Sequence, residues 1–345
     1  MKRIKKSLIQ TCLPYGIGLV ASIVIFLLIL TSLKLDPVAG LKYLIISSLG
    51  DSFSIQQTFI YMSMLVLAST AFLISIKGGF INIGIEGQLH LGAILAYTTS
   101  ILIGERLSSF LTIFAAFTAS VVGGILWIII PLILRIMLKV NEVFVTMILN
   151  FIAPLIVSWM VTGPFRDPRM AHPQSIPIPV LAQLPLIPGT RLHVGVLLSF
   201  VVCFFTWFLL QKTTWGMYIK AVGSNPVAAR AMGIDVEKTT VMVSLLSASI
   251  ASLAGFIEIN GNSHVLMERF SIGWGYLGIA VAILGNLNPL GVLLASLFYA
   301  MLISGGRGLE IKLGVPIEIA FILQVAMVLA VVIARSWFSE KVSKL

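Results

Sequence analysis

The most chemically capable side chains of the sequence lie in the glycine-rich stretch 78–88, which reads GGFINIGIEGQ between two apolar runs. This stretch carries an amide at Asn82, a carboxylate at Glu86 and a second amide at Gln88. Glycines weaken a helix, and unwound backbone at membrane depth is tolerated only where protein or a wet cavity surrounds it. Two interpretations stay open. The stretch is either a broken helix whose three polar side chains line a path, or a tight turn that leaves Glu86 at the water boundary.

A second group of amides interrupts the long apolar region 276–304, where Asn286 and Asn288 stand just before Pro289. The interruption predicts two short helices or a re-entrant hairpin. The ends of such half-helices form binding sites in transporters, which makes both asparagines candidates for a substrate path. A plain short loop is the alternative.

Asn150 lies deep in the apolar run 143–162. A polar side chain at that depth is costly unless it faces a cavity or finds a partner. Asn150 is therefore another candidate for the path, and a hydrogen bond between two helices is the simpler explanation.

A different kind of signal lies in the polar segment 223–233. Asn225 suits a helix N-cap, Pro226 the first helical position and Gly233 the stop. The helix between them has barely two turns, which is too short to be stable alone. One face of this helix would carry Val227, Ala228, Ala231 and Met232. Such a short apolar-faced helix is expected to dock into a groove on another protein, and lying on the membrane surface is the alternative.

Catalytic signatures are missing. The sequence has no G-x-x-x-x-G-K-[ST] loop, no G-x-S-x-G elbow and no cysteine and histidine pattern with zinc spacing. Cys12 and Cys203 each lie in or beside an apolar run. We therefore predict that the chain is not an enzyme, binds no metal and holds no cofactor of its own.

The composition defines the elements that must position these residues. The chain has 345 residues, of which 58% are hydrophobic and 10% charged, whereas about 25% are charged in a typical soluble domain. This excludes a soluble enzyme, a disordered protein and a disulfide-rich secreted domain. The net charge of +10 indicates Lys and Arg in cytoplasmic loops more readily than nucleic-acid binding.

A membrane-spanning helix needs about 20 apolar residues. Runs of this kind fall at 13–33, 56–76, 110–134, 143–162, 193–210, 239–257 and 317–334, with a shorter run at 84–103. The apolar run that follows the basic amino terminus is too long for the core of a signal peptide, so we expect it to be retained. The prediction is an all-α, polytopic membrane bundle of about 8–10 transmembrane segments, with broken or short helices near 78–90 and 276–304. We expect residues 1–345 to form a single transmembrane domain.

The distribution of Lys and Arg favours an orientation with both termini inside the cell. In that orientation the polar segment 211–239 is a cytoplasmic loop. The proline-rich segment 163–192 is then an outside loop, extended and stiff.

Three stretches together resemble the permease subunits of bacterial ABC importers in the branched-chain amino acid and simple-sugar family. They are 79–88 with its N-I-G-x-E-G-Q pattern, 223–233 with G-x-N-x-x-A-A-x-x-x-G, and 275–291 with G-x-x-G-I-A-V-A-x-L-G-x-x-x-P-x-G. The similarity covers roughly 55–335. The first pattern, in its full form, resembles the nucleoside and simple-sugar branch more than the amino acid branch.

The resemblance implies that the short helix in segment 211–239 couples the chain to an ATPase. The matching positions are Gly223, Asn225, Pro226, Ala228, Ala229, Ala231 and Gly233. It further implies a partner ABC ATPase that binds the ATP, a second permease subunit, and an extracellular substrate-binding lipoprotein of the basic-membrane-protein type, all at a bacterial plasma or inner membrane. The outside loop 163–192 is a candidate surface for that lipoprotein.

The predicted function is therefore import of nucleosides by alternating access. A simple sugar such as ribose is an equally polar and uncharged alternative. A secondary transporter driven by an ion gradient is a different class of alternative, and it would need acidic residues deep in the spans. Glu86, Glu258 and Glu318 are the candidates for that role.

Overall fold

A computed structural model describes the backbone of residues 2–316 and 318–343, and side chains between residues 16 and 334 apart from 19 and 317. Within these residues every regular element is helical, and extended pairing is limited to isolated bridges. The predicted all-α class is confirmed.

The helices follow the predicted apolar runs closely. In chain order they are α1 (Lys2–Ser32), α2 (Pro37–Leu49), α3 (Ser52–Lys77), α4 (Ile85–Ile103), α5 (Ser109–Leu138), α6 (Glu142–Thr162), the 3-10 turn η1 (Val180–Ala182), α7 (Val194–Lys212), α8 (Thr214–Ser224), α9 (Pro226–Ala231), α10 (Val236–Ile257), the π-helical turn η2 (Glu258–Ser263), α11 (Trp274–Leu284), α12 (Pro289–Leu313) and α13 (Glu318–Ser343). Among the described residues, 6 helices are long and apolar enough to cross a membrane: α3, α5, α6, α7, α10 with η2, and α12. Four shorter apolar helices accompany them.

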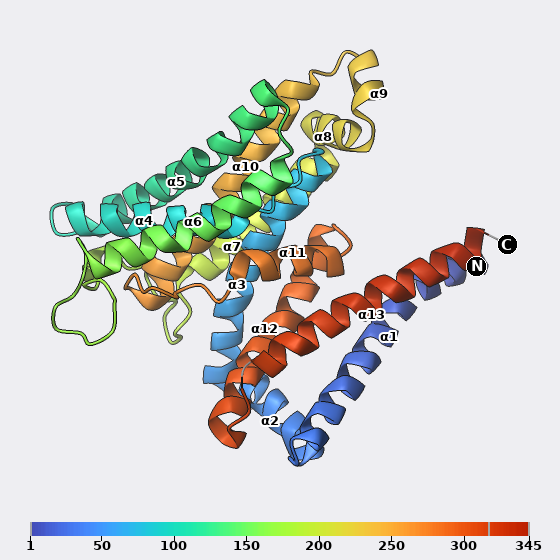
Figure 1. The fold of residues 1–345 in the computed structure, drawn as a ribbon, viewed down its shortest axis with the longest axis horizontal. Coiled ribbons are helices and arrows are strands. Elements are labelled where there is room, and N and C mark those ends of the chain that lie inside the picture. The colour runs from blue at the N-terminus through green and yellow to red at the C-terminus, as the bar shows by residue number, and fades with distance from the viewer. Residues whose placement is uncertain (1, 317, 344–345) are drawn as a thin grey trace. The chain divides into compact units, whose positions relative to one another are not determined.

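The chain divides into two compact units, which are described separately. The first unit comprises Met1–Met62 and Leu297–Leu345. In it α1 and α13 run side by side in opposite directions, so that the start of α1 and the end of α13 lie at the same end (Figure 1). Its core consists of Phe26, Leu30, Leu44, Leu302, Leu309, Val315, Ile319 and Leu323.

Helix α2 was not among the predicted spans, because its 13 residues are fewer than a membrane crossing requires. Its start nevertheless follows from local sequence. Asp36 is the N-cap and accepts hydrogen bonds from the backbone amides of Val38 and Ala39, and Pro37 occupies the first helical position.

The second unit comprises Ser63–Ser296. Its centre is formed by α4, α5 and α10, which pack directly on one another. Small residues permit this packing: a Cβ on Gly124 of α5 would lie 2.4 Å from the carbonyl oxygen of Ala248 in α10. Helices α8 and α9 pack at one end of α10 (Figure 1).

Both predicted interruptions exist. Residues 80–83, between α3 and α4, are not helical, and Gly79 has the positive φ angle of +76° that favours glycine. Between α11 and α12 the chain turns through Asn286 and Leu287, whose φ angles of 57° and 50° are also left-handed. The second interruption separates one short helix of 11 residues from one long helix of 25, rather than two short ones.

Candidate functional site

The interruption before α4 places Asn82 and Gln88 in a reciprocal amide pair. Each side-chain nitrogen donates to the other side-chain oxygen at 3.0 Å. Asn82 Nδ2 also donates to Ser247 Oγ of α10 at 2.9 Å, and Ser247 in turn donates to the carbonyl oxygen of Ala71 in α3 at 2.7 Å. Both amide side chains are fully buried. The pair therefore joins three helices at the point where the backbone is unwound.

Asn150 of α6 completes the same cluster from the other side. Its Oδ1 accepts a hydrogen bond from the backbone amide of Gly87 at 2.9 Å, and its Nδ2 donates to the carbonyl oxygen of Ile83 at 2.8 Å. The first amides of a helix have no partner within it, so Asn150 supplies one for α4. Gly87 permits the close approach of both Asn150 and Trp127, because a Cβ there would lie 3.2 Å from Asn150 Oδ1 and 2.3 Å from the indole nitrogen of Trp127.

Glu86 is buried, with 4% of its surface exposed, and both of its carboxylate oxygens have partners. Oε1 accepts from Ser271 Oγ at 2.5 Å, and Oε2 accepts from the backbone amide of Gly275 at 2.7 Å. Ser271 Oγ itself accepts from the backbone amide of Gly273 at 3.1 Å. Because Gly275 lies in the first turn of α11, Glu86 holds the start of that helix, where a negative charge is favourable.

Asn286 and Asn288 lie elsewhere, in the exposed tight turn between α11 and α12. Asn288 Oδ1 accepts from the backbone amide of Leu290 at 3.0 Å, which caps the start of α12. The structure thus brings together Asn82, Glu86, Gln88 and Asn150, and leaves these two asparagines apart.

The short helix α9 has the predicted cap. Asn225 Oδ1 accepts from the backbone amides of Val227 and Ala228 at 3.0 Å each, and Pro226 is the first helical residue. The face that we predicted to dock is exposed, with Val227 at 75% and Met232 at 67% of full exposure. Ala229 faces inward and is buried.

Helix α8 ends against the loop that carries Asn82. A Cβ on Gly223 would lie 2.1 Å from the carbonyl oxygen of Lys77, and the backbones of Gly223 and Gly79 are in contact. Two glycines therefore allow the segment before α9 to touch the unwound stretch before α4. The sequence alone did not predict this contact.

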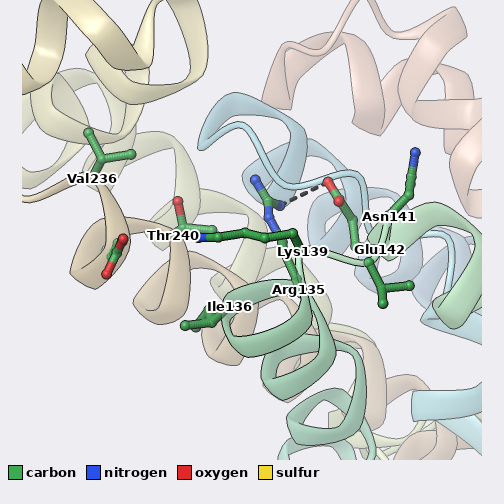
Figure 2. Close-up of a pocket in the computed structure, with 9 residues that line it drawn as sticks. Arg135, Ile136, Lys139, Asn141, Glu142, Val236 and Thr240 are labelled. Atoms are coloured by element: carbon green, nitrogen blue, oxygen red, sulfur yellow. Dashed lines mark hydrogen bonds and ion pairs between the residues drawn. The ribbon is translucent and has the colours of Figure 1, made fainter.

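An ion pair at the end of α5 holds the same loop. Arg135 Nη1 donates to Glu142 Oε1 of α6 at 2.8 Å, and Arg135 Nη2 donates to the carbonyl oxygen of Gly79 at 3.2 Å. The Arg135 guanidinium also lies 5.1 Å from the centre of the Phe80 ring. Figure 2 shows this pair at one side of a cavity of about 420 Å³, with Lys139 and Thr240 also on its wall. This ion pair was not predicted from the sequence, although an Arg and a Glu that flank a short helix break were a usable signal.

The acidic residues that an ion-driven carrier would require are differently placed. Glu86 and Glu258 are buried, and Glu258 Oε1 accepts from Asn262 Nδ2 at 2.9 Å, whereas Glu318 is exposed. Among the described residues, no group of three or more His, Cys, Asp and Glu side chains is arranged to hold a metal ion.

Comparison with known proteins identifies relatives over nearly the whole chain. Residues 54–332 match the family model described as the branched-chain amino acid transport system permease component. A glucose ABC transporter permease protein of Haloferax volcanii is 32% identical over 322 residues, which cover 90% of this chain and 84% of that protein. A guanosine ABC transporter permease protein of Bacillus subtilis is 30% identical over 82% of each chain. A nucleoside ABC transporter permease protein of Lactococcus lactis is 27% identical over 90% of this chain and 88% of that protein.

Proposed function

Since the chain belongs to the family of branched-chain amino acid transport system permease components and is a multi-pass membrane subunit of an ABC importer, we propose that it moves nucleosides. It is a transport subunit and not an enzyme. Its similarity to permeases for guanosine and for nucleosides supports this substrate class. A glucose permease is 32% identical to this chain, a higher identity than that of either nucleoside relative, so a simple sugar is the second candidate.

The observation that carries the coupling part of the proposal is the exposed apolar face of α9. Val227 and Met232 are large apolar side chains on a six-residue helix. A helix this short is not stable alone, and contact of its apolar side chains with water is unfavourable. A groove on the partner ATPase, which binds and hydrolyses the ATP, is the occupant that the family implies. Movement of α9 is passed to the unwound stretch through the contact of Gly223 with Gly79.

The substrate path proposed here uses amides and hydroxyls more than charges. A nucleoside is uncharged and carries several hydrogen-bond donors and acceptors. A side-chain amide such as that of Asn82 or Gln88 can both donate to and accept from these groups. In the arrangement described above these amides bind each other, so opening of the loop at 78–84 would free them for substrate. Asn286 and Asn288 lie apart from these amides, in the exposed turn between α11 and α12, and the path proposed here would meet them at a separate point.

The assembly we propose contains a second permease subunit, an extracellular substrate-binding lipoprotein and the membrane lipid. In each of α5, α6 and α7, only 33% of the most apolar 18-residue segment is buried within the chain. These apolar surfaces need lipid or a second permease to cover them. Both termini are proposed to be cytoplasmic, and the loop 163–192 then meets the lipoprotein on the outside.

Uptake by cells with and without this chain tests the proposal. We expect ATP-dependent uptake of labelled uridine and adenosine to be lost without the chain, and excess unlabelled ribose or leucine not to compete. Loss of ribose or glucose import with normal nucleoside uptake would show that the substrate is a sugar and that the chain is still an importer subunit. Co-purification of the ATPase with the chain tests the partner separately.

A further inference from the structure

The first compact unit contains a cavity of about 510 Å³ at the start of α3. Its walls come from the end of α2, the first turns of α3 and the last turns of α12. Pockets of roughly 300–1,000 Å³ hold small ligands in proteins. The cavity is therefore large enough for an organic solute.

Tight packing of α2 on α3 and α12 holds these walls in place before any ligand binds. A Cβ on Gly308 of α12 would lie 2.0 Å from Ser47 Oγ, so glycine is needed for α2 to approach this closely. Ser304 Oγ donates to the carbonyl oxygen of Ser47 at 3.2 Å, and Thr58 Oγ1 of α3 donates to that of Ser48 at 2.9 Å. Helix α2 is thus fixed to both α12 and α3.

A positively charged group is held in place on the wall. The guanidinium of Arg307 lies 4.8 Å from the centre of the Tyr61 ring, and its Nη1 donates to Tyr61 Oη. Tyr61 is buried, so it forms a fixed platform for the cation. A guanidinium has five N–H donors, and those not used on Tyr61 are available to a ligand. Lys312 adds a second cation to the lining.

Acceptors line the same cavity. Asp51 Oδ1 accepts from the backbone amide of Ser54 at 2.7 Å, and this bond lowers the pKa of Asp51 below its usual value. Asp51 is therefore ionised at neutral pH, and its carboxylate is an acceptor on the cavity wall. Within the described part of the chain, the half-buried amide of Gln57 and the hydroxyl of Ser47 have no hydrogen-bond partner. Phe53, with 54% of its surface exposed, offers a flat apolar ring.

This combination of groups selects the chemistry of the ligand. An anion would be repelled by Asp51, and a cation by Arg307 and Lys312. An uncharged solute with hydroxyl donors and ring acceptors fits better, because its donors can bind Asp51 and its acceptors Arg307. The Gln57 amide can accept from such a solute through its oxygen and donate to it through its nitrogen. A flat heterocycle gains further by contact with the Phe53 ring.

The proposed orientation with cytoplasmic termini places the cavity on the outer face of the membrane. From a cytoplasmic amino terminus α1 leads to the outside, and α2, at 13 residues, is too short to cross back. Asp51 then lies outside at the start of α3, so the cavity opens on the face where the external lipoprotein releases substrate.

We propose that this cavity, lined by Asp51, Gln57 and Arg307, is an entry site for nucleosides. The inference rests on the proposed function, since it names where that substrate class first binds. It adds a site that is independent of the buried amides before α4.

Photolabelling of the assembled permease and ATPase complex in lipid vesicles tests the site. The probe is 8-azidoadenosine, added without the lipoprotein, and the labelled peptides of this chain are identified by mass spectrometry. We expect label in 46–61 or 304–312, prevented by excess adenosine. Loss of one hydrogen bond to a ligand weakens binding about tenfold, so Gln57→Ala should lower the labelling to about one tenth.

Gln56→Ala is the matched control. Gln56 is the adjacent residue of α3, and its amide donates to Ser52 Oγ at 2.7 Å instead of lining the cavity. Its variant should label like the natural chain. Equal loss in both variants, or label only elsewhere, would overturn the entry site. Nucleoside uptake measured in parallel separates the two proposals: uptake without label at the cavity overturns the site alone, and label without uptake overturns the function alone.

Discussion

The carboxylate of Glu86 accepts a hydrogen bond at 2.7 Å from the backbone amide of Gly275, 189 positions further along the chain. The same carboxylate accepts from Ser271 Oγ, so it holds both the start of α11 and the loop that precedes it. Glu86 stands four residues after Asn82, on the helix that follows the unwound stretch. One side chain thereby ties the position of α11 to the loop at 78–84.

Replacement of Glu86 separates a positioning role from a purely interfacial one. Glu86→Ala leaves the buried amide of Gly275 without an acceptor, which costs about 1–3 kcal/mol. We expect reduced uptake and a lower unfolding temperature. Glu86→Gln keeps one acceptor and should lose uptake with little change in stability.

The exposed carboxylate of Glu318 offers the control, and Glu318→Gln should behave like the natural chain. Unchanged uptake in both Glu86 variants would show that the carboxylate has no part in transport.

A charge on the exposed face of α9 should uncouple the two subunits. Ala228→Arg places a guanidinium where an apolar groove is expected, and burial of an unpaired charge is costly. We expect the protein to insert in the membrane, to lose ATP-dependent uptake, and to retain less ATPase on purification. Ala228→Ser adds only a hydroxyl and should keep most of the uptake. Normal uptake by the arginine variant would exclude α9 as the coupling helix.

Local sequence patterns predicted most of the fold. The apolar runs have the length of a membrane helix, and the glycines at 78–88 and the asparagines before Pro289 mark real interruptions. Helix α2 was missed because a length criterion rejects a 13-residue helix, even though Asp36 and Pro37 are a recognisable start. The π-helical turn η2 has no equivalent signal in the hydrophobic pattern.

The partners of the polar residues were the part that the sequence did not reveal. Asn82 and Gln88 are six residues apart, and their amide pair depends on how the loop folds back. The bond of Glu86 to Gly275 and the contact of Gly79 with Gly223 join distant segments. Periodicity reports on one helix at a time and contains no information about which helices meet.

The ion pair of Arg135 and Glu142 should matter through the loop it holds. In Arg135→Glu the carbonyl oxygen of Gly79 loses its hydrogen-bond donor, and Glu142 faces a second negative charge that repels it. We therefore expect uptake to fall, and also the amount taken up per ATP hydrolysed. The double variant Arg135→Glu with Glu142→Arg restores the attraction. Contacting pairs show interaction energies of about 0.5–3 kcal/mol, so the double variant should recover a measurable part of the loss. Additive losses would mean that the pair does not act as a unit.

His193, just before α7, should make stability depend on pH. Burial, and then the charge of His264, lower the pKa of His193 from 6.5 to about 4, and a Cβ on Gly261 would lie 2.8 Å from its ring. Because the folded state prefers the neutral ring, the unfolded state binds more protons between pH 6.5 and 4. Stability is therefore full above about pH 6.5 and falls as the pH drops towards 4. Thermal unfolding in detergent from pH 7.5 to 4.5 measures this fall.

The variant His193→Phe assigns the effect, since a ring of similar size without a titrating group should flatten the pH dependence. His172, exposed in the loop between α6 and α7, is the matched control, and His172→Phe should leave the slope unchanged. Because the pKa of His193 is lowered in the folded state, stability must fall on acidification. A rise in stability at lower pH would contradict the burial of a neutral His193. An equal slope in the natural chain and in His193→Phe would place the titrating group elsewhere.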